Sequence, residues 1–273
     1  MFYTYLIFSV ALIPLLDRFY AVLREPYSWW LVPLLVSAFF VSFIIIQLAV
    51  FFISAAFVDI NKPSERLAKY FRFIVNLTLP LLLKLARVKI NLSGEDKITE
   101  NGRMLFVCNH QHNYDPIIML AAFPQAEIGF IAKKEIYETM PFVAKLMHKL
   151  YCLPIDRENN REAVKTIISA VKILKEGKAS IGLFPEGYTS KNCEILPIRN
   201  GSLKIAYKAN VPIVVCVINN TQAIQKNMFK RKTEVEFRVL EVLNPADYKN
   251  MSSSELGDII YNQMKEALIE IRK

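Results

Sequence analysis

Residues 29–58 contain no charged side chain, and this run limits the possible folds more than any other feature of the sequence. Serines, Gln47 and Pro33 are its main interruptions. A helix needs about 20 apolar residues to cross a bilayer, so the run is long enough to span one with some tilt. Tyr27, Trp29 and Trp30 form an aromatic group where a membrane interface would be. We therefore expect a transmembrane helix here.

An earlier apolar run covers residues 2–16, with Thr4 and Ser9 as its polar members. As a helix it would reach only about 22 Å, which is short for a hydrocarbon core of about 30 Å. A signal peptide is not favoured, because a basic first region and a small-residue cleavage pattern are both missing. We expect a short or tilted membrane helix, so that residues 1–60 form a membrane anchor with one or two transmembrane helices.

The net charge of +9 is carried by the part of the chain that follows this anchor, since residues 1–58 hold two acids and two bases. A basic domain beside a hydrophobic anchor favours anionic lipids or acidic substrates. Nucleic acid is not expected, because the basic residues are not interleaved with aromatics in a recognisable module. More Lys and Arg follow the long apolar run than precede it, which predicts a cytoplasmic domain.

Residues 61–87 are predicted to form a basic amphipathic region with a kink at Pro80. On a helix its basic and amide side chains fall within roughly 120°, and the rest of the surface is rich in Leu, Ile and Phe. Such a helix would lie in the membrane surface. The alternative is a helix that packs on the core of the next domain, and the two are compatible. The polar set comprises Arg66, Lys69, Arg72, Asn76, Lys84 and Arg87.

From residue 88 onward, apolar runs typical of strands alternate with helical patterns. This alternation predicts an α/β domain over residues 88–273, with a mostly parallel or mixed sheet flanked by helices. A capping box at Ser252 and Glu255 predicts a final helix that continues to Ile271. The expected strands are 88–92, 104–108, 128–132, 152–155, 180–184, 213–218 and 234–242, and the other expected helices are 115–123, 141–150, 161–175 and 201–209.

The segment Asn109–Pro116 directly follows the predicted strand 104–108 and joins it to the next helix, which is expected to have Pro116 at its first position. Four residues separate His110 from Asp115, so the loop can fold the carboxylate back onto the imidazole. A carboxylate on one ring nitrogen fixes the tautomer and raises the basicity of the other, which makes a base suited to an alcohol. Residue types alone leave open an N-capping Asp beside an incidental His.

Metal binding and cysteine chemistry are not favoured. A site with His112 would need further ligands, and the third histidine, His148, stands alone on a mixed helical face. The four cysteines form no Cys-x-x-Cys pair and are expected to be buried in a reducing compartment. Cys108 is a conceivable acyl-carrying nucleophile, but its position also fits the core, which we favour. The cysteines are Cys108, Cys152, Cys193 and Cys216.

Other polar residues follow predicted strands, at the edge where α/β sheets bind ligands. Glu186 lies between Pro185 and Gly187, where a fixed turn would hold its carboxylate to accept bonds from substrate hydroxyls; a purely structural turn is the alternative. Cations recur at the same edge, and the arginines among them suit bidentate contact with a phosphate. These cations are Lys134, Arg157, Lys191 and Arg199.

Four blocks between residues 109 and 215 resemble, in sequence and order, those of the lysophosphatidic acid acyltransferases in the glycerophospholipid acyltransferase superfamily. The first combines Asn109-His110 with Asp115, and the third is Phe184-Pro185-Glu186-Gly187. The second covers residues 133–157 with Pro141-Phe142 inside it, and the fourth is Asn210-Val211-Pro212-Ile213-Val214.

The resemblance implies acyl transfer to the free hydroxyl of lysophosphatidic acid, making phosphatidic acid. His110 would deprotonate the hydroxyl, Asp115 would orient His110, and the alkoxide would attack an acyl thioester directly. Glu186 and Gly187 would serve the acceptor, and Arg157 its phosphate. Membrane lipids, the lysophospholipid acceptor and acyl-CoA or acyl carrier protein are the implied partners, and the basic domain suits either acidic donor. No cofactor or metal is implied.

One departure concerns the acceptor. The family usually continues its third block as Thr-Arg-Ser, whereas this chain has Tyr188-Thr189-Ser190. Lys191 or Arg199 would replace the missing Arg, or the acceptor differs. The alternatives are therefore transfer to another lysolipid or to glycerol phosphate, and a non-catalytic lipid-binding protein. A bacterial plasma membrane is the expected location, with the endoplasmic reticulum as the alternative.

Overall fold

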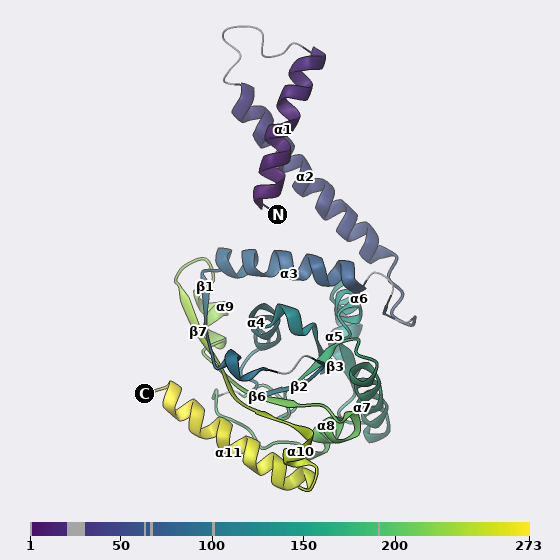
Figure 1. The fold of residues 1–273 in the computed structure, drawn as a ribbon, viewed down its shortest axis with the longest axis vertical. Helices are drawn as coiled ribbons and strands as arrows, with labels where there is room; N and C mark the ends of the chain where they lie inside the picture. Colours follow the sequence, from purple (N-terminus) through teal and green to yellow (C-terminus); the bar gives the residue numbers. More distant parts are fainter. Residues whose placement is uncertain (1, 21–30, 63, 66–67, 100–101, 191) are drawn as a thin grey trace. The chain divides into compact units, whose positions relative to one another are not determined.

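The computed structural model describes residues 2–20, 31–62, 64–65, 68–99, 102–190 and 192–273. The chain divides into two compact units, Met1–Asp59 and Ile60–Lys273. The described part of the first unit contains two helices, α1 (Phe2–Tyr20) and α2 (Leu31–Ala56) (Figure 1). They contact each other where the Tyr5 hydroxyl donates to Gln47 Oε1 at 2.8 Å.

Helix α2 has the length and composition of a membrane-spanning helix. It is 26 residues long and, among the described residues, it is the one helix that meets both conditions. The apolar part of α1, Thr4–Pro14, is shorter. Large side chains such as Ile45 and Phe52 are exposed on α2, which is favourable only where the surroundings are also apolar.

The second unit is built on a mixed sheet of seven strands in the order β1-β7-β6-β2-β5-β3-β4 within the described residues. Neighbouring strands are parallel except β6 and β7, which are antiparallel. The strands are β1 (Val88–Ser93), β2 (Leu105–Cys108), β3 (Ile128–Lys133), β4 (Leu153–Ile155), β5 (Ser180–Leu183), β6 (Ile213–Asn219) and β7 (Thr233–Leu243). The predicted α/β class is therefore confirmed.

Helices cover both faces of this sheet (Figure 1). The larger ones are α3 (Ala68–Leu85), α4 (Asp115–Ala122), α6 (Pro141–Lys149), α7 (Asn160–Lys175) and α11 (Ser253–Ile271), and the shorter ones are α5 (Lys134–Thr139), α8 (Lys204–Ala209), α9 (Gln222–Asn227) and α10 (Pro245–Tyr248). Helix α11 starts with the predicted capping box of Ser252 and Glu255. Asp115, not Pro116, is the first residue of α4.

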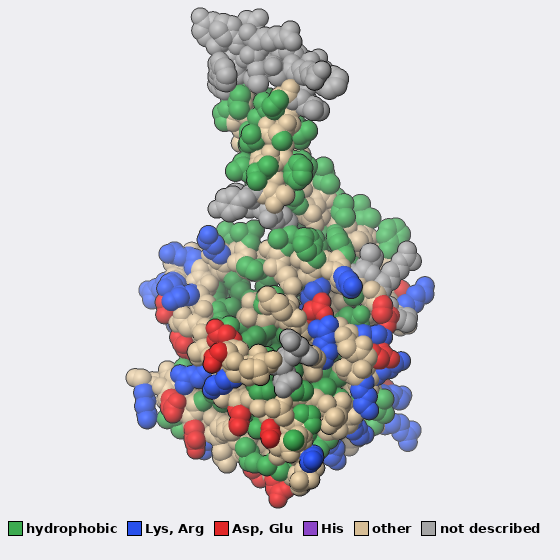
Figure 2. Space-filling model, in the orientation of Figure 1, with side chains coloured by type: hydrophobic (Ala, Val, Ile, Leu, Met, Phe, Trp, Pro, Cys, Tyr) green, Lys and Arg blue, Asp and Glu red, His purple; other side chains and the backbone are tan. Residues whose placement is uncertain are grey.

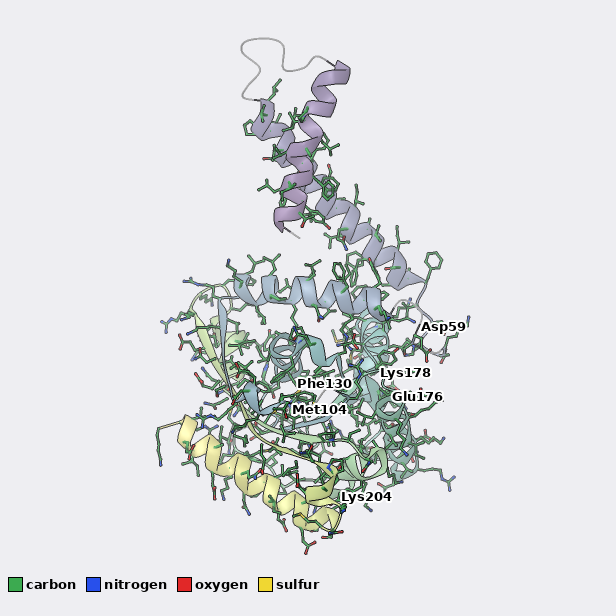
Figure 3. All side chains as sticks on the ribbon, in the orientation of Figure 1. Asp59, Met104, Phe130, Glu176, Lys178 and Lys204 are labelled. Carbon is green, nitrogen blue, oxygen red and sulfur yellow. The ribbon has the colours of Figure 1, made fainter. Side chains whose placement is uncertain are left out.

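Two apolar cores lie on opposite faces of the sheet, as expected where strand residues alternate between faces. One includes Phe106 and Phe237 with side chains of α3 and α4, and the other includes Leu105 and Val107 with side chains of α7, α8 and α11. Met104 and Phe130, both in the first core, lie in the interior of the unit (Figure 3). The strands β2, β5 and β6 are fully buried, with Asn219 at the end of β6 as the exception.

The polar face predicted for the amphipathic region differs from the one that α3 shows. The sequence predicts Arg72 on a polar face, but Arg72 is buried and donates to the carbonyl oxygens of Glu127, Ile128 and Leu150 at 2.9–3.1 Å. Asn76 likewise donates to Pro124 O at 3.3 Å. These two side chains face the domain because they satisfy backbone carbonyl groups there.

The outward face of α3 is instead largely apolar. Phe73, Leu81, Leu82 and Leu85 are exposed, whereas Phe71 and Leu83 pack into the domain. The helix thus packs on the core of the domain, which is one of the two predicted arrangements. It also exposes apolar side chains on its outer side.

Candidate active site

The strand order brings three loops together at one edge of the sheet. Strand β2 lies between β6 and β5, and all three run in the same direction. The segments that follow their carboxyl ends therefore meet, which is the usual place for ligands in α/β sheets. His110 follows β2, Glu186 follows β5 and Thr221 follows β6.

His110 and Asp115 are in direct contact. His110 Nδ1 and Asp115 Oδ2 are 2.8 Å apart, as the spacing of the two residues predicted. The Asp115 side chain is fully buried, and that of His110 is 13% exposed. Among the described residues Nε2 of His110 has no hydrogen-bond partner, so it is the nitrogen free to exchange a proton with a bound hydroxyl.

Three further donors fix the Asp115 carboxylate. Its Oδ2 accepts the backbone N–H of Gln111 at 2.6 Å and that of His112 at 2.9 Å. Its Oδ1 accepts a hydrogen bond from the Thr221 hydroxyl. Since the side chain caps no helix end here, the alternative of an N-capping Asp is not what the structure shows.

The residues on either side of His110 are anchored to β6 and the residues after it. Asn109 Nδ2 donates to Ile218 O at 2.9 Å, and its Oδ1 accepts Ile218 N–H at 2.7 Å. Gln111 Oε1 accepts the N–H of Asn220 at 3.0 Å. Both side chains are buried. They continue the pairing of β2 with β6 beyond the last strand residue and hold the backbone of His110 between them.

Aromatic rings support the imidazole from one side. The His110 ring stacks on Phe184, with ring centroids 4.3 Å apart and an interplanar angle of 21°. Phe184 in turn stacks on Phe130, with centroids 5.9 Å apart. Stacking restricts the rotation of the His110 ring, so the direction of Nε2 is set by packing as well as by Asp115.

Glu186 occupies a buried position in which both carboxylate oxygens are already used. One oxygen accepts His110 N–H at 2.8 Å and the other accepts Leu196 N–H at 3.1 Å. Burial raises the pKa of Glu186 to about 7, the two backbone hydrogen bonds act against this shift, and the nearby Asp115 adds to it. The carboxylate braces the loop of His110 against the loop after β5, which is the structural role that the sequence left open.

Arg157 and Arg199 gather around Tyr188. The guanidinium carbon of each lies 5.1 Å from the centre of the Tyr188 ring, within the range of a cation–π contact. Burial and the neighbouring Arg199 lower the pKa of Arg157. Gly187 has φ +79°, and a Cβ there would lie 2.9 Å from Arg199 Nε, so Gly187 leaves the space that Arg199 occupies.

The other predicted contacts with substrate lie further out. Thr189 is exposed beside Tyr188. Lys134 is about half exposed and pairs with Glu138 at 3.3 Å and with Asp156 at 3.9 Å. Lys191 lies outside the described residues. The structure thus brings Arg157 and Arg199 together, and it places Lys134 among acids.

The remaining histidines and Cys108 are set apart from this chemistry. His148 on α6 contacts Lys62 O at 2.8 Å, and His112 stacks on Tyr114 with centroids 5.0 Å apart. Within the described ranges no three His, Cys, Asp or Glu side chains form a group that could hold a metal. Cys108 is fully buried, and burial raises the pKa of its thiol well above the ordinary value, which disfavours a nucleophilic thiolate.

Thr221 and Asn109 are parts of the site that sequence reasoning missed. Thr221 follows a predicted buried strand, so its place at the carboxyl edge was foreseeable. Its contact with Asp115 was not, because that contact depends on β6 lying next to β2. Asn109 belongs to a recognisable sequence motif, but its pairing with Ile218 depends on the same strand order.

The sequence of this chain is similar to those of known acyltransferases. Residues 89–219 match the family model described as Acyltransferase. A probable 1-acyl-sn-glycerol-3-phosphate acyltransferase of Mycoplasma pneumoniae is 28% identical over 220 residues, which are 76% of this chain and 79% of that protein. The 1-acyl-sn-glycerol-3-phosphate acyltransferase of Salmonella typhimurium is 30% identical over 159 residues, 58% of this chain and 62% of that protein.

A solved structure has a similar fold. The crystal structure of the 1-acyl-sn-glycerophosphate acyltransferase PlsC from Thermotoga maritima superimposes with a TM-score of 0.59 at 20% sequence identity. The match covers 100% of this chain and 98% of that chain. At this identity the likeness concerns the fold.

Proposed function

Because residues 89–219 match the Acyltransferase family model, we propose that this chain transfers an acyl group from an acyl thioester to the free hydroxyl of lysophosphatidic acid, making phosphatidic acid for phospholipid synthesis. The contact of His110 with the buried Asp115 carries this proposal. The relatives named above share the same acceptor in their names, which supports the choice of lysophosphatidic acid.

His110 acts as the general base. Nε2 takes the proton of the acceptor hydroxyl while Asp115 holds Nδ1–H and stabilises the imidazolium that forms. The alkoxide oxygen forms a bond to the thioester carbonyl carbon, and the C–S bond then breaks. The imidazolium returns its proton to the leaving thiolate. No acyl-enzyme is formed, which is consistent with the buried Cys108 thiol.

Arg157 and Arg199 are the proposed site for the acceptor phosphate. They carry two positive charges around Tyr188, on loops at the same edge of the sheet as His110. Guanidinium groups suit the oxygens of a phosphate better than a lysine does. Arg199 thereby supplies the charge that Thr189 lacks. Lys134 and Lys191 are secondary candidates for contact with the acidic substrates.

The acyl donor is proposed to be acyl-CoA or acyl carrier protein. Both are acidic, and the net charge of +9 favours their approach. The mechanism uses no cofactor and no metal, so that chelators should leave the rate of transfer unchanged.

The protein is membrane-associated, as expected for an enzyme of lipid synthesis that carries an apolar helix such as α2. We place it in a bacterial plasma membrane with the α/β domain on the cytoplasmic side, where the positive-inside bias puts the cations that follow α2. The exposed apolar face of α3, with Phe73 and Leu82, is proposed to lie in the membrane surface near the lipid substrates.

Transfer of a labelled acyl group by the purified chain in detergent tests the function. The donors are acyl-CoA and acyl carrier protein, and the acceptors are lysophosphatidic acid, glycerol phosphate, lysophosphatidylcholine and lysophosphatidylethanolamine. We expect transfer to lysophosphatidic acid. Transfer only to another acceptor would show that residues 188–191 select a different head group, and no transfer to any acceptor would contradict the proposal.

A further inference from the structure

The loop between α9 and β7 exposes an aromatic side chain next to three cations. Phe229 is 71% exposed and has φ 63°, a backbone conformation that bulky residues rarely adopt. Lys230, Arg231 and Lys232 follow it directly, and all three are exposed. A Phe side chain exposed to water contributes no free energy of burial. A strained backbone that holds this side chain in solvent therefore indicates an apolar partner.

Hydrogen bonds define the shape of this loop. Met228 N–H donates to Ile224 O at 2.8 Å, which ends α9. Lys230 N–H and Arg231 N–H both donate to Asn227 O, at 2.8 and 2.9 Å. The turn is therefore closed on itself, and Phe229 is held at its outer side.

The loop lies beside the end of α3. Thr233 N–H donates to Arg87 O at 2.9 Å, and Arg87 Nη1 donates to Lys230 O at 3.4 Å. The parallel pairing of β1 with β7 starts at the same point, with Val88 opposite Thr233. Phe229 therefore belongs to the same end of the domain as the exposed Leu82 and Leu85 of α3.

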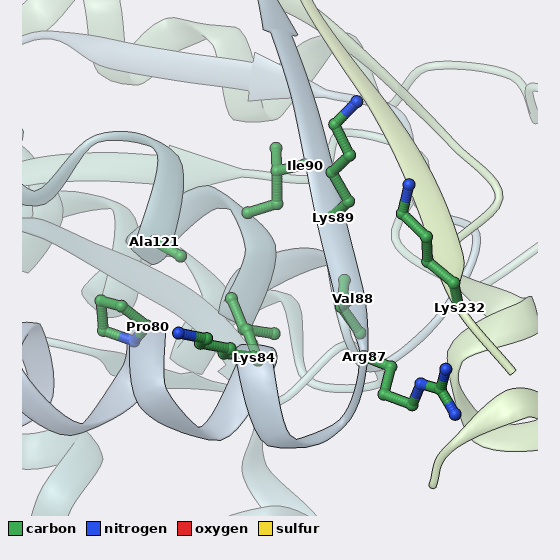
Figure 4. A pocket seen from close by; sticks show the side chains of 9 residues that line it. Pro80, Lys84, Arg87, Val88, Lys89, Ile90, Ala121 and Lys232 are labelled. Atoms are coloured by element: carbon green, nitrogen blue, oxygen red, sulfur yellow. The ribbon is translucent and has the colours of Figure 1, made fainter. Parts of the chain in front are cut away.

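A surface pocket of about 450 Å³ lies at this end, lined by apolar and basic residues (Figure 4). Its apolar lining comes from α3, β1 and α4, and includes Leu83, Val88 and Ala121. Lys84 extends from α3, while Lys89 and Lys232 lie next to each other on adjoining chain segments (Figure 4). The cations surround the pocket without converging on one point, which suits an extended anionic surface better than a single small anion.

The charge around the loop is strongly positive. Lys232 pairs with Glu234 at 2.5 Å, but among the described residues Lys84, Lys230 and Arg231 form no ion pair. Lys and Arg side chains gather at the edge of the apolar band formed by α3 (Figure 2). Each such cation adds to the attraction toward an anionic membrane.

We propose that residues 228–232 extend the apolar face of α3, at its last turns, into a docking surface for a bilayer that contains anionic phospholipids. Phe229 inserts among the acyl chains, and the surrounding cations contact lipid phosphates. An acidic protein would also match the charge, but the exposed Phe229, Leu82 and Leu85 match hydrocarbon, and the chain already carries the apolar helix α2. This surface uses no residue of the reaction.

Tryptophan fluorescence of the full chain in vesicles tests the proposal. The only two tryptophans, Trp29 and Trp30, are replaced by Phe. Phe229→Trp then reports on the loop, and Ile269→Trp, at a 52% exposed position on α11, is the matched control. The vesicles hold phosphatidylcholine with brominated acyl chains, with or without about 30% phosphatidylglycerol.

We expect brominated lipid to quench the tryptophan at 229 by about twofold or more in the anionic vesicles and by less in phosphatidylcholine alone. The control at 269 should change little. Replacing Lys230, Arg231 and Lys232 by Gln should remove the dependence on anionic lipid, as should high salt. Equal quenching at 229 and 269, or none at 229, would overturn the docking surface and leave the proposed acyl transfer standing.

Discussion

The loop of His110 and the group around Tyr188 lie at the same edge of the sheet but are held in different ways. His110 is fixed by Asp115, by the ring of Phe184 and by backbone hydrogen bonds on both sides. Arg157 and Arg199 are placed mainly by contact with the half-exposed ring of Tyr188. We call His110, Asp115 and their hydrogen-bond partners the buried region, and Arg157, Tyr188 and Arg199 the outer region. The buried region has one geometry, as proton transfer requires, whereas the outer region can adjust to the shape of an acceptor.

The comparison predicts that changes in the buried region lower kcat and changes in the outer region raise KM. His110→Ala should show the largest effect, because no other group can take the proton of the hydroxyl. We expect the initial rate of acyl transfer to fall by roughly 10²–10⁴-fold with the fold retained. His148→Ala, on α6, is the control and should keep most of the activity. A near-normal rate in His110→Ala would falsify the mechanism.

Arg199→Ala should raise KM for the acceptor by about 10–100-fold, because a hydrogen bond between charged groups contributes roughly 1.5–3 kcal/mol. Its kcat should stay within about twofold. Tyr188→Ala should behave similarly, and Tyr188→Phe should keep the KM of the parent because the ring remains. If Arg199→Ala lowers kcat and leaves KM unchanged, the outer region is part of the chemistry and the distinction fails.

Thr221→Val should lower kcat by about tenfold, since it leaves Asp115 Oδ1 buried without its donor. Thr221→Ser keeps the hydroxyl and should restore most of the rate. Steady-state kinetics with the acceptor varied would show whether KM stays constant, as it should for a residue that acts through Asp115. A rise in KM alone would place Thr221 with the outer region instead.

Glu186 should affect stability more than activity. Its pKa is raised to about 7 in the folded chain, mainly by burial. The folded state then binds the proton more tightly than the unfolded state, so the free energy of unfolding falls as pH rises from about 4.5 to about 7 and is level above that. Each unit of pKa shift corresponds to about 1.4 kcal/mol.

Glu186→Gln removes this titration, so urea unfolding across that pH range should show a flatter dependence than in the parent chain. The side-chain amide still accepts one of the two backbone N–H groups, which favours a folded variant. Identical pH dependence in the two proteins would show that Glu186 is ionised normally in the folded chain.

The fold was predictable from the sequence where a signal is local. Each predicted strand is present, and the most apolar runs, such as residues 104–108, form strands that are buried on both faces. Helices α5, α9 and α10 were not predicted, since their four to six residues carry little periodicity. The orientation of α3 was also missed, because a helical projection cannot show that Arg72 meets three carbonyl groups from distant loops.

In the candidate site, too, local contacts were predictable from the sequence and long-range contacts were not. His110 and Asp115 are five positions apart, so their contact follows from one loop. Thr221 meets Asp115 only because β6 and β2 are neighbours, and the bonds of Glu186 to His110 and Leu196 depend on the folding of another loop. Sequence reasoning found groups that act within a segment, and it could not find partners that the sheet brings together.

The bonds of Arg72 have a practical consequence for any shortened version of the protein. The alternating pattern of strands and helices begins at residue 88, which invites truncation there. A chain starting at Val88 would lose the guanidinium that satisfies the carbonyls of Glu127, Ile128 and Leu150 and would open the cavity filled by Phe71. A truncated enzyme should therefore keep the whole of α3. Because the leucines of α3 stay exposed, this shorter protein will need detergent for purification even without α1 and α2.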